Sequence, residues 1–556
     1  MSKIKKHKYI FVCGGVMSGV GKGITTSSIA LILKSKGFKV NPIKIDPYLN
    51  VDAGTMNPGE HGEVFVLESG LECDQDMGNY ERFLGCALPR ENYMTNGMVL
   101  KHVIDKERAL GYGGKCVEPM YHVTEEVIRR IEVSRELTKS DISIIEIGGT
   151  VGEYQNSLFI EAARLVKIKH SGDVAFVMVS YLPIPSVIGE MKTKPTQAAI
   201  RTLNSHGVHP DIIIGRSSKP IDQKRKEKIA EASGIPVEHI ISAPDIESIY
   251  EVPLNFEKDD LGNTLLTILG VKYRASKKRN LNEWRTMFNR MKNATTPVNI
   301  GIVGKYFKTG DFVLRDVYIS IIESLKHAAG VVGAKINIDW IDSTDFEEGG
   351  DGSLSDLAKY NGILIPGGFG GRGVEGKIKT IQYLRENKIP FFGICYGMQL
   401  AVIEYARNIL ELSGANTKEV DKSTPYPVID IMPEQIKNLD SKQYGGTMRL
   451  GVYKAVLEPR TLAQRLYNQG IIKERHRHRY EVNPTYIEQL EKSGLIFPGK
   501  SPNGQLMELI ELPQDVHPFF IGTQFHPEFT GNPIKPHPLF VGFVKAAKDR
   551  GLQKDK

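Results

Sequence analysis

The chain has 556 residues, 41% of them hydrophobic and 25% charged, which is enough for several ordinary globular domains. Its net charge of +7 is a mild basic excess that suits anionic small ligands and gives no reason to expect a nucleic-acid partner. An apolar stretch of membrane-spanning length, the apolar core of a signal peptide and a CxxC pair are all missing from the sequence. We therefore expect a cytoplasmic protein with reduced cysteines and no membrane contact.

The first half predicts alternating strands and helices. A strand at 9–13 leads into a glycine-rich loop at 14–23 and a helix that ends near Lys36, and a second strand covers 39–45. The pattern resumes with strands at 142–147, 174–180 and 211–215 and helices at 157–169, 196–205, 223–232 and 261–269. This alternation is typical of a parallel sheet covered on both faces. Residues 47–120 show little periodicity, and we expect them to form ligand-binding loops.

A change of composition divides the chain. Residues 273–297 are basic and polar with one helical stretch at 284–291, which predicts a linker. The α/β pattern then restarts, with strands at 298–303, 335–341, 362–365, 389–394, 506–511 and 519–524 and loop insertions at 413–445. We therefore predict two doubly wound parallel-sheet α/β domains, residues 1–272 and 298–556, joined by the linker 273–297.

One cysteine stands in a setting that favours catalysis. The strand at 389–394 ends at Cys395, between Gly393 and Gly397. Gly-x-Cys-x-Gly is the sulfur version of the turn that raises a nucleophile above a parallel sheet. His526 and Glu528 follow another apolar run and can supply a base and its orienting acid. A buried structural cysteine is the alternative, and the HPE segment favours the nucleophile.

The loop GGVMSGVGKG at 14–23 resembles a phosphate-binding loop without matching the strict pattern. Val16 and Gly23 stand where the pattern has Gly and a hydroxyl residue. The glycines still let backbone amides converge on an anion at a helix start, and Lys22 adds a charge. Because position 23 lacks a hydroxyl, we expect carboxylates elsewhere to hold Mg²⁺. The candidates are Asp74, Asp76 and Glu146.

Ten segments, in order along the whole chain, resemble the CTP synthase family of glutamine-dependent enzymes that aminate UTP. They are GGVMSGVGKG, KIDPYLNVDAGTMNPGEHGEVF, ECDQDMGNYERF, EIGGTVG, KTKPTQ, PDIIIGRS, PGGFGGRG, GICYGMQ, RHRHRYEVN and TQFHPEF. The second-half segments alone indicate a class I glutamine amidotransferase, a domain that works with many partners. KTKPTQ and the first-half set indicate the synthetase, a P-loop-like amidoligase.

For the second half, the resemblance implies glutamine hydrolysis. Cys395 would attack the glutamine amide, His526 would move the proton and Glu528 would orient His526. Backbone amides near Gly368 would hold the oxyanion, a kind of donor worth ~3 kcal/mol. The implied glutamine-binding residues are Gly368, Gln399, Glu419 and Arg479.

For the first half, the resemblance implies that ATP and Mg²⁺ serve to phosphorylate the 4-oxygen of UTP, and that ammonia then displaces the phosphate. The implied ATP-binding residues are Gly19, Val20, Gly21, Lys22, Gly23, Lys44 and Asp76, with Asp76 and Glu146 on the metal. The implied UTP- or CTP-binding residues are Ser18, Glu118, Glu153, Gln155, Lys192, Lys194, Gln197 and Lys228. The resemblance also implies an ammonia passage lined by His61, activation by GTP near Arg372, feedback inhibition by CTP, and a homotetramer.

Two segments depart from the family pattern around the pyrimidine nucleotide. GTVGEYQN at 149–156 replaces the usual GTVGDIES, and KCVEPMYHVT at 115–124 replaces TVQVIPHIT. Glu118 and Gln155 look like a reciprocal exchange of a carboxylate and an amide. The segments indicate either a compensated UTP site or a pocket for a modified pyrimidine nucleotide. Gly371 also replaces a bulkier residue, a difference that bears on GTP activation.

We expect UTP amination because the catalytic and phosphate-binding positions persist. Two alternatives from other classes stay open at this point. One is a non-catalytic, filament-forming paralogue of the enzyme. The other is a P-loop ATPase of the partitioning type, which would share the first loop and little else.

Overall fold

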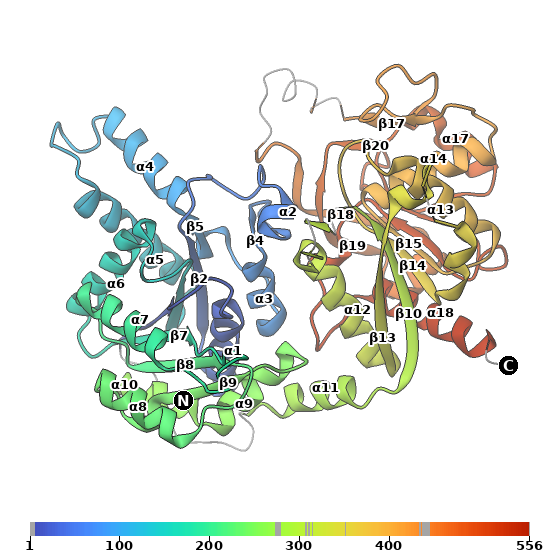
Figure 1. Cartoon of the computed structure of the whole chain (residues 1–556). Helices are drawn as coiled ribbons and strands as arrows, with labels where there is room; N and C mark the ends of the chain where they lie inside the picture. Colours follow the sequence, from blue (N-terminus) through green and yellow to red (C-terminus); the bar gives the residue numbers. More distant parts are fainter. Residues whose placement is uncertain are drawn as a thin grey trace. The chain divides into compact units, whose positions relative to one another are not determined.

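The computed structural model describes residues 6–272, 280–305, 316–350, 352–432, 435 and 445–554, and the backbone of 308–309, 312–313 and 315. Its two compact units are Met1–Asp52 with Asp76–Phe288, and Ala53–Gln75 with Asn289–Lys556 (Figure 1). A short segment from the first half of the sequence, Ala53–Gln75, therefore packs within the second unit. Residues 273–279 of the predicted linker lie outside the described residues.

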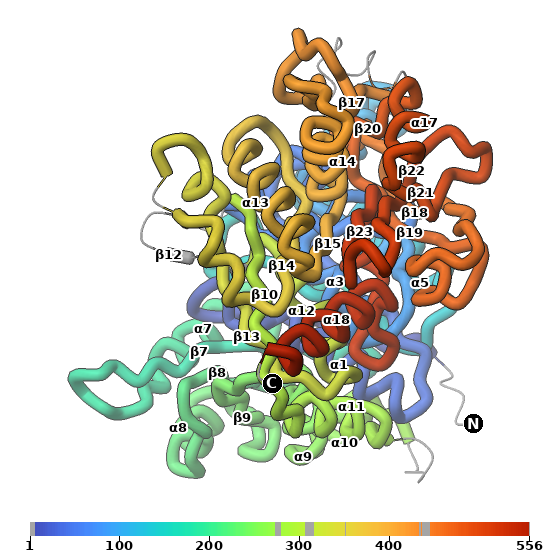
Figure 2. The backbone as a smooth tube through the Cα atoms, turned by 90° about the vertical axis from the view of Figure 1, so that its right-hand side faces the viewer, coloured from blue at the N-terminus to red at the C-terminus, as the bar shows by residue number. Residues whose placement is uncertain are grey.

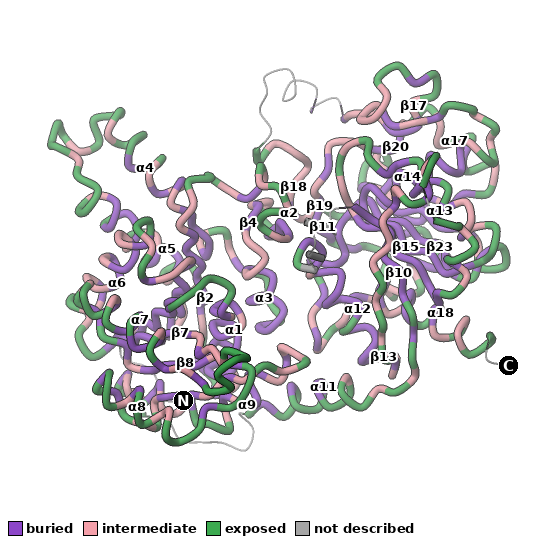
Figure 3. Tube along the Cα trace, viewed as in Figure 1, coloured by how far each residue is buried: buried purple, intermediate pink, exposed green. Residues whose placement is uncertain are grey.

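The first unit is built on a seven-stranded parallel sheet with the order β5-β2-β6-β1-β7-β8-β9. The strands are β1 (Lys8–Gly14), β2 (Val40–Asp46), β5 (Tyr93–Thr95), β6 (Ile142–Ile147), β7 (Val174–Tyr181), β8 (Ile212–Ser217) and β9 (Ile240–Pro244). Nearly all their residues are buried (Figure 3). Continuous burial is the mark of a parallel sheet covered on both faces, as predicted.

Helices cover this sheet from both sides. α1 (Lys22–Ser35) packs on β1, β2 and β6 and contacts α9 (Val252–Lys258) and α10 (Leu261–Ile268). The opposite face carries Phe11, Ile145 and Phe176, which share one apolar core with the other helices. Those helices are α4 (Asn96–Arg108), α5 (Thr124–Thr138), α6 (Ser157–Lys169), α7 (Lys194–Ser205) and α8 (Gln223–Ser233).

The prediction that residues 47–120 form loops is wrong. Besides β5 and α4, this stretch holds α2 (Pro58–His61), β3 (Val64–Val66), β4 (Glu72–Asp74) and α3 (Gln75–Leu84). α3 escapes a periodicity search because it buries polar as well as apolar side chains, among them Asn79, Glu81 and Arg82. α4 buries only Gly97, Val99 and Val103, so its apolar stripe is too narrow to detect.

The second unit is built on a nine-stranded sheet with the order β13-β10-β14-β15-β23-β22-β21-β18-β19. The first five strands are parallel: β13 (Ala334–Asp342), β10 (Thr296–Gly304), β14 (Gly362–Ile365), β15 (Phe391–Ile394) and β23 (Phe520–Thr523). The last four are antiparallel: β22 (Met507–Glu511), β21 (Ile496–Lys500), β18 (Arg449–Leu457) and β19 (Ile471–His478). The parallel part is the predicted doubly wound core, and the antiparallel strands extend it.

α13 (Val374–Glu386) and α14 (Tyr396–Asn408) pack together in one apolar core of this unit. α12 (Ile319–Val332) and α18 (Pro538–Lys554) lie side by side in another (Figure 2). α11 (Asn282–Lys292), α16 (Leu462–Tyr467) and α17 (Pro484–Lys492) complete the longer helices of the described residues. The short strands are β11 (Lys308–Thr309), β12 (Phe312–Val313), β16 (Asn416–Thr417), β17 (Pro427–Ile431) and β20 (Tyr480–Val482).

The region 413–445, predicted as loop insertions, contains β16 and β17, and its residues 433–434 and 436–444 lie outside the described part of the chain. Within the described ranges, no helix combines the length and hydrophobicity that crossing a membrane requires.

Candidate functional site

Cys395 occupies the elbow between β15 and α14. Its backbone has φ 51° and ψ −98°, a conformation that costs energy for a residue with a side chain and that recurs at functional sites. The flanking glycines are needed for packing, because a Cβ on Gly397 would lie 2.2 Å from the carbonyl oxygen of Ile365. β15 pairs with β23, so the carboxyl ends of these parallel strands bring Cys395 and the segment after Thr523 together.

His526 and Cys395 flank the same glycine at this edge of the sheet. A Cβ on Gly367 would lie 3.1 Å from Cε1 of His526 and 3.7 Å from Cβ of Cys395. Nδ1 of His526 is 2.7 Å from Oε1 of Glu528. These distances show that the structure brings together the three predicted catalytic side chains. Nε2 of His526 is buried and makes no hydrogen bond with any described residue.

The triad is electrostatically suited to an ion pair. Burial by itself would lower the pKa of His526, but the carboxylate of Glu528 and the sulfur of Cys395 outweigh it and raise that pKa to about 10. Nε2 of Gln524 lies 3.7 Å from Sγ of Cys395, and the sulfur is 3.8 Å from the carbonyl oxygen of Arg477. The arrangement can hold a thiolate beside an imidazolium, as a cysteine nucleophile requires.

A cavity of about 300 Å³ opens beside the cysteine. It is lined by Gly368, Phe369, Cys395, Tyr396, Gln399, Glu419, His478, Arg479 and Tyr480. All four predicted glutamine-binding residues are therefore together with the nucleophile. Nε2 of Gln399 donates to the carbonyl of Tyr480 at 2.9 Å, and Oε1 of Glu419 accepts from the backbone amide of Gly370 at 2.7 Å. Burial raises the pKa of Glu419.

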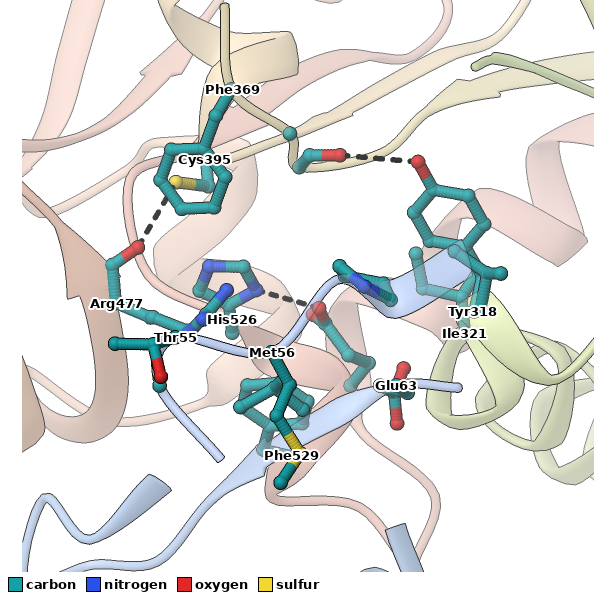
Figure 4. Close-up of a pocket in the computed structure, with 17 residues that line it drawn as sticks. Thr55, Met56, Glu63, Tyr318, Ile321, Phe369, Cys395, Arg477, His526 and Phe529 are labelled. Atoms are coloured by element: carbon teal, nitrogen blue, oxygen red, sulfur yellow. Dashed lines mark hydrogen bonds and ion pairs between the residues drawn. The ribbon is translucent and has the colours of Figure 1, made fainter. Parts of the chain in front are cut away.

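A second cavity, of about 190 Å³, borders all three residues of the triad (Figure 4). The segment Ala53–Gln75 forms one wall through Thr55, Met56 and Glu63, and α12 adds Ile321. His61, the predicted lining of an ammonia passage, lies exposed at the end of α2, whose first residue, Pro58, lines the cavity instead.

Contacts with α12 and β19 anchor this segment in the second unit. Glu63 accepts from the backbone amide of Ser320 at 3.2 Å, at the start of α12. Nε of Arg477 donates to Oε1 of Glu72 at 2.8 Å. The guanidinium of Arg475 donates to the carbonyl of Val66 at 3.0 Å. Sequence reasoning missed this wall, because nothing local in residues 53–75 indicates a partner four hundred positions away.

The phosphate loop joins β1 to α1 as predicted. Gly21 adopts φ 87° at the N-cap of α1, and Lys22 donates to the carbonyl of Gly149 at 2.7 Å. Burial lowers the pKa of Lys22, and the nearby carboxylate of Glu146 opposes that effect. A Cβ on Gly23 would lie 1.8 Å from Oδ1 of Asp76. The carboxylate of Asp76 therefore fills the space where the strict phosphate loop has its hydroxyl side chain.

The two predicted metal ligands converge on one lysine. Nζ of Lys44 is 2.5 Å from Oδ2 of Asp76 and 2.8 Å from Oε1 of Glu146. Burial would raise the pKa of Asp76, but Lys44 outweighs it and lowers that pKa, whereas burial raises the pKa of Glu146. In the described ranges, no three His, Cys, Asp or Glu side chains are grouped as a metal site. Two carboxylates fit Mg²⁺, which usually keeps waters and takes phosphate oxygens as further ligands. Asp74, the alternative, ends β4 in the other unit.

A cavity of about 230 Å³ next to the phosphate loop was missed by sequence reasoning. Gly21 and Thr25 form one side, and residues at the carboxyl ends of β8 and β9 form the other. Among the latter, Arg216 pairs with Asp245 at 2.8 Å. The rule that ligands bind outside the carboxyl ends of parallel strands was the available signal.

The predicted pyrimidine-binding residues fall into separate groups. Gln197 on α7 donates to the carbonyl of Lys228 on α8 at 3.3 Å, which places these two together. Lys192 and Lys194 stand near the start of α7, and Ser18 is exposed in the phosphate loop.

The two departing segments both pack against α6, but their altered side chains are not hydrogen-bonded to one another in the described structure. Glu153 accepts from the backbone amide of Thr150 and from the side chain of Gln155, each at 3.0 Å. Glu118 is exposed at the start of the turn 119–123 and makes no hydrogen bond with Gln155 within the described residues. No direct contact between Glu118 and Gln155 in the described residues therefore supports the idea of a reciprocal exchange. Arg372 is exposed in the loop before α13.

Comparison with known proteins finds relatives that match 98–99% of the chain. Residues 8–271 match the family described as CTP synthase N-terminus, and residues 313–546 match Glutamine amidotransferase class-I. The CTP synthase of Pyrococcus abyssi is 50% identical over 551 residues, which cover 99% of each chain. That of Methanocaldococcus jannaschii is 50% identical over 551 residues, 98% of this chain and 99% of the relative. A solved Trypanosoma brucei CTPS glutaminase domain with bound acivicin is 36% identical over 45% of this chain and 94% of that chain, with a TM-score of 0.41. The chain belongs to the CTP synthase family.

Proposed function

We propose that this protein aminates UTP at position 4 to give CTP, using ATP and the ammonia released from glutamine. The main support for this proposal is that a single chain of this family contains the residues proposed for both reactions. A Cys395–His526 pair adjoins a cavity of glutamine size, and a phosphate loop stands with paired carboxylates in the other unit. A non-catalytic paralogue is disfavoured, because such a protein has no need of a strained nucleophile elbow.

Glutamine hydrolysis follows from the geometry of the second unit. The thiolate of Cys395 attacks the side-chain amide carbon, and backbone amides near Gly368 stabilise the oxyanion. The imidazolium of His526, held by Glu528, gives its proton to the leaving ammonia. Water, deprotonated by the same imidazole, then releases glutamate from the thioester. Ammonia, uncharged as it leaves, reaches the synthetase site.

The first unit activates UTP. Lys22 and Lys44 bind the ATP phosphates as point charges, and the amides of the loop 14–23 orient them. The cavity beside Gly21 and Arg216 takes the adenine and ribose of ATP. Asp76 and Glu146 would hold Mg²⁺, which neutralises phosphate charge when bound. Transfer of the γ-phosphoryl group to the 4-oxygen of UTP gives a leaving group, and ammonia displaces it as phosphate.

The finer family properties belong to the same proposal. Lys192, Lys194, Gln197 and Lys228, with Ser18, bind the triphosphate of UTP or CTP. CTP inhibits by occupying this site, GTP activates near Arg372, and the active form is a homotetramer in the cytoplasm. Despite the altered segments 115–124 and 149–156, the proposed nucleotide is UTP rather than a modified pyrimidine nucleotide, because the catalytic, ATP, metal and triphosphate positions persist.

Initial rates of CTP formation test the proposal. We expect turnover of UTP with ATP, Mg²⁺ and glutamine, and less turnover of dUTP or base-modified analogues. C395A should lose the reaction with glutamine and keep it with ammonium chloride at alkaline pH, since only the ammonia source is removed. Absence of CTP from UTP under both conditions, with turnover of an analogue, would overturn the UTP assignment. Equal glutaminase rates in C395A and the wild type would favour the non-catalytic reading.

A further inference from the structure

Lys377 is a buried lysine for which the described residues offer no hydrogen-bond partner. It lies on α13, one turn into the helix, and its exposed fraction is 0%. Its Nζ is buried and makes no hydrogen bond with any described residue. A lysine is almost never fully buried unless it is paired, because desolvating an ammonium costs several kcal/mol. The proposed mechanism gives this side chain no role.

The lysine lies against the residue that follows the nucleophile. Its Nζ is 5.7 Å from the centre of the Tyr396 ring, and Nζ of Lys305 is 6.0 Å from the same centre. Two lysines therefore share one aromatic ring next to Cys395. Among the described residues, Lys305 has hydrogen-bond acceptors and Lys377 has none.

Tyr396 and Lys305 both hold the glycine-rich loop 366–373, which we call the lid. The phenol of Tyr396 donates to the carbonyl of Gly370 at 3.2 Å, and Lys305 donates to the same carbonyl at 3.2 Å and to that of Phe369. The amide of Gly370 is bound by Glu419. The lid supplies the backbone proposed for the oxyanion, so its position depends on the charge of Lys305.

The surroundings of Lys377 disfavour a second ammonium. Burial, followed by the charge of Lys305, lowers the pKa of Lys377 to about 7, and Asp342 acts in the opposite direction. The carboxylate of Asp342 already accepts from the amide and hydroxyl of Thr344, at 3.0 and 2.8 Å. Glu347 approaches the backbone of Gly376 on the same side of α13. A proton on Lys377 therefore meets the like charge of Lys305 beside the same ring, and the opposing charge, Asp342, already accepts two hydrogen bonds from Thr344.

We propose that Lys377 is a positioning residue for glutamine hydrolysis, acting as a neutral amine that lets Lys305 and Tyr396 hold the lid closed. Protonation of Lys377 repels Lys305 and draws water to the buried site, which loosens the lid. The glutaminase half is then pH-sensitive through a group that touches neither glutamine nor Cys395. This inference rests on the proposed hydrolysis of glutamine.

Glutaminase kinetics of the full chain at pH 6 to 8.5 provide the test. With a midpoint near pH 7, we expect the wild-type KM for glutamine to rise about tenfold from pH 8 to pH 6, with a smaller change in kcat. K377M, which keeps the length without the charge, should lose this rise. K377R, always charged, should show the high KM at every pH. K379M changes an exposed lysine on the same helix and should match the wild type.

A wild-type KM that is flat from pH 6 to 8.5, or a K377M profile that keeps the full acid rise, would overturn the proposal. The wild-type measurement does not depend on any variant. The proposal therefore stays testable even if K377M folds poorly. Thermal unfolding separates this failure from failure of the proposed function. If the wild type hydrolyses no glutamine at any pH, the function is wrong. The melting temperature of K377M relative to the wild type should still change between pH 6 and pH 9, because that readout needs only a buried titrating lysine.

Discussion

Arg477 donates a hydrogen bond of 2.8 Å to Glu72, although 405 positions separate them in the sequence. Both are nearly inaccessible, with side-chain exposures of 11% and 1%. The guanidinium of Arg477 lies 5.3 Å from the ring centre of Phe369 in the lid, and its carbonyl contacts the sulfur of Cys395. Glu72 is four residues before Asp76 in the chain. One ion pair therefore fastens the end of the segment Ala53–Gln75 to β19, next to Cys395.

We expect E72Q to weaken glutamine use selectively. The amide keeps the shape but removes the charge that Arg477 faces, a loss of about 1–3 kcal/mol for a buried hydrogen bond to a charged group. Glutamine-dependent CTP formation should fall about tenfold or more, while the ammonia-dependent rate stays within about twofold. E68Q, at an exposed position of the same segment, is the control. If E72Q and E68Q have the same effect, the Arg477–Glu72 ion pair has no part in glutamine-dependent CTP formation.

We expect G23S, which restores the strict phosphate-loop residue, to damage the synthetase. Its Cβ would start 1.8 Å from Oδ1 of Asp76, so the carboxylate must leave Lys44 or the loop must move. ATP-dependent CTP formation from ammonia should fall by about 100-fold or more, the range for losing a positioned charge. Glutaminase activity should persist. G470S, where a Cβ meets nothing within 4 Å, should retain both activities. A G23S enzyme as active as the wild type would show that Asp76 does not need this space.

The strands and helices with strong periodicity were predictable from the sequence. α6 was predicted over its observed residues, and the strands at β6 and β14 likewise. The sequences of these elements either alternate regularly between apolar and polar residues or are apolar throughout. Gly or charged residues mark their ends. The Cys395 elbow was predictable for a related reason, since its glycines are dictated by close backbone packing visible as a local motif.

The rest depended on tertiary contacts that leave no local signal. α3 buries Arg82 against Asn79, so its polar residues looked like loop. The wall formed by residues 53–75 depends on bonds to β19 and α12 from a distant part of the chain. Nothing in the sequence singled out Lys377, and only its burial in the structure distinguishes it. Sequence reasoning named residues that the structure brings together around Cys395 and around Lys44, but it missed the residues that support them.

We expect K44M to make the first unit dependent on divalent cation. Removing the ammonium leaves Asp76 and Glu146 facing each other in a buried site, which costs stability of about 3 kcal/mol. Added Mg²⁺ should restore part of that loss, so the rise in melting temperature with Mg²⁺ should be larger for K44M than for the wild type. K39M, at an exposed position next to β2, is the control. If Mg²⁺ shifts both proteins equally, the two carboxylates are not a cation site.

The charge on His526 should appear in the pH dependence of stability. Its pKa is raised to about 10 in the folded chain, above ~6.5 in the unfolded chain. A raised pKa gives stability that is fully present below pH 6.5 and is lost as pH rises towards 10. We therefore expect the unfolding free energy of the wild type, relative to H526Q, to decrease by on the order of 4 kcal/mol over this range. Denaturant titrations of the second-unit transition at several pH values measure it.

The partners of the imidazole make this prediction specific. Glu528 and Cys395 both raise the pKa, so C395A should move the decline to lower pH and E528Q should move it further, because Glu528 is the larger contributor. E528Q should also reduce glutamine turnover by about 100-fold, since the imidazole loses both its orientation and its charge partner. A stability difference that does not vary with pH would mean that His526 is neutral in the folded chain. The thiolate–imidazolium pair would then form only when glutamine binds.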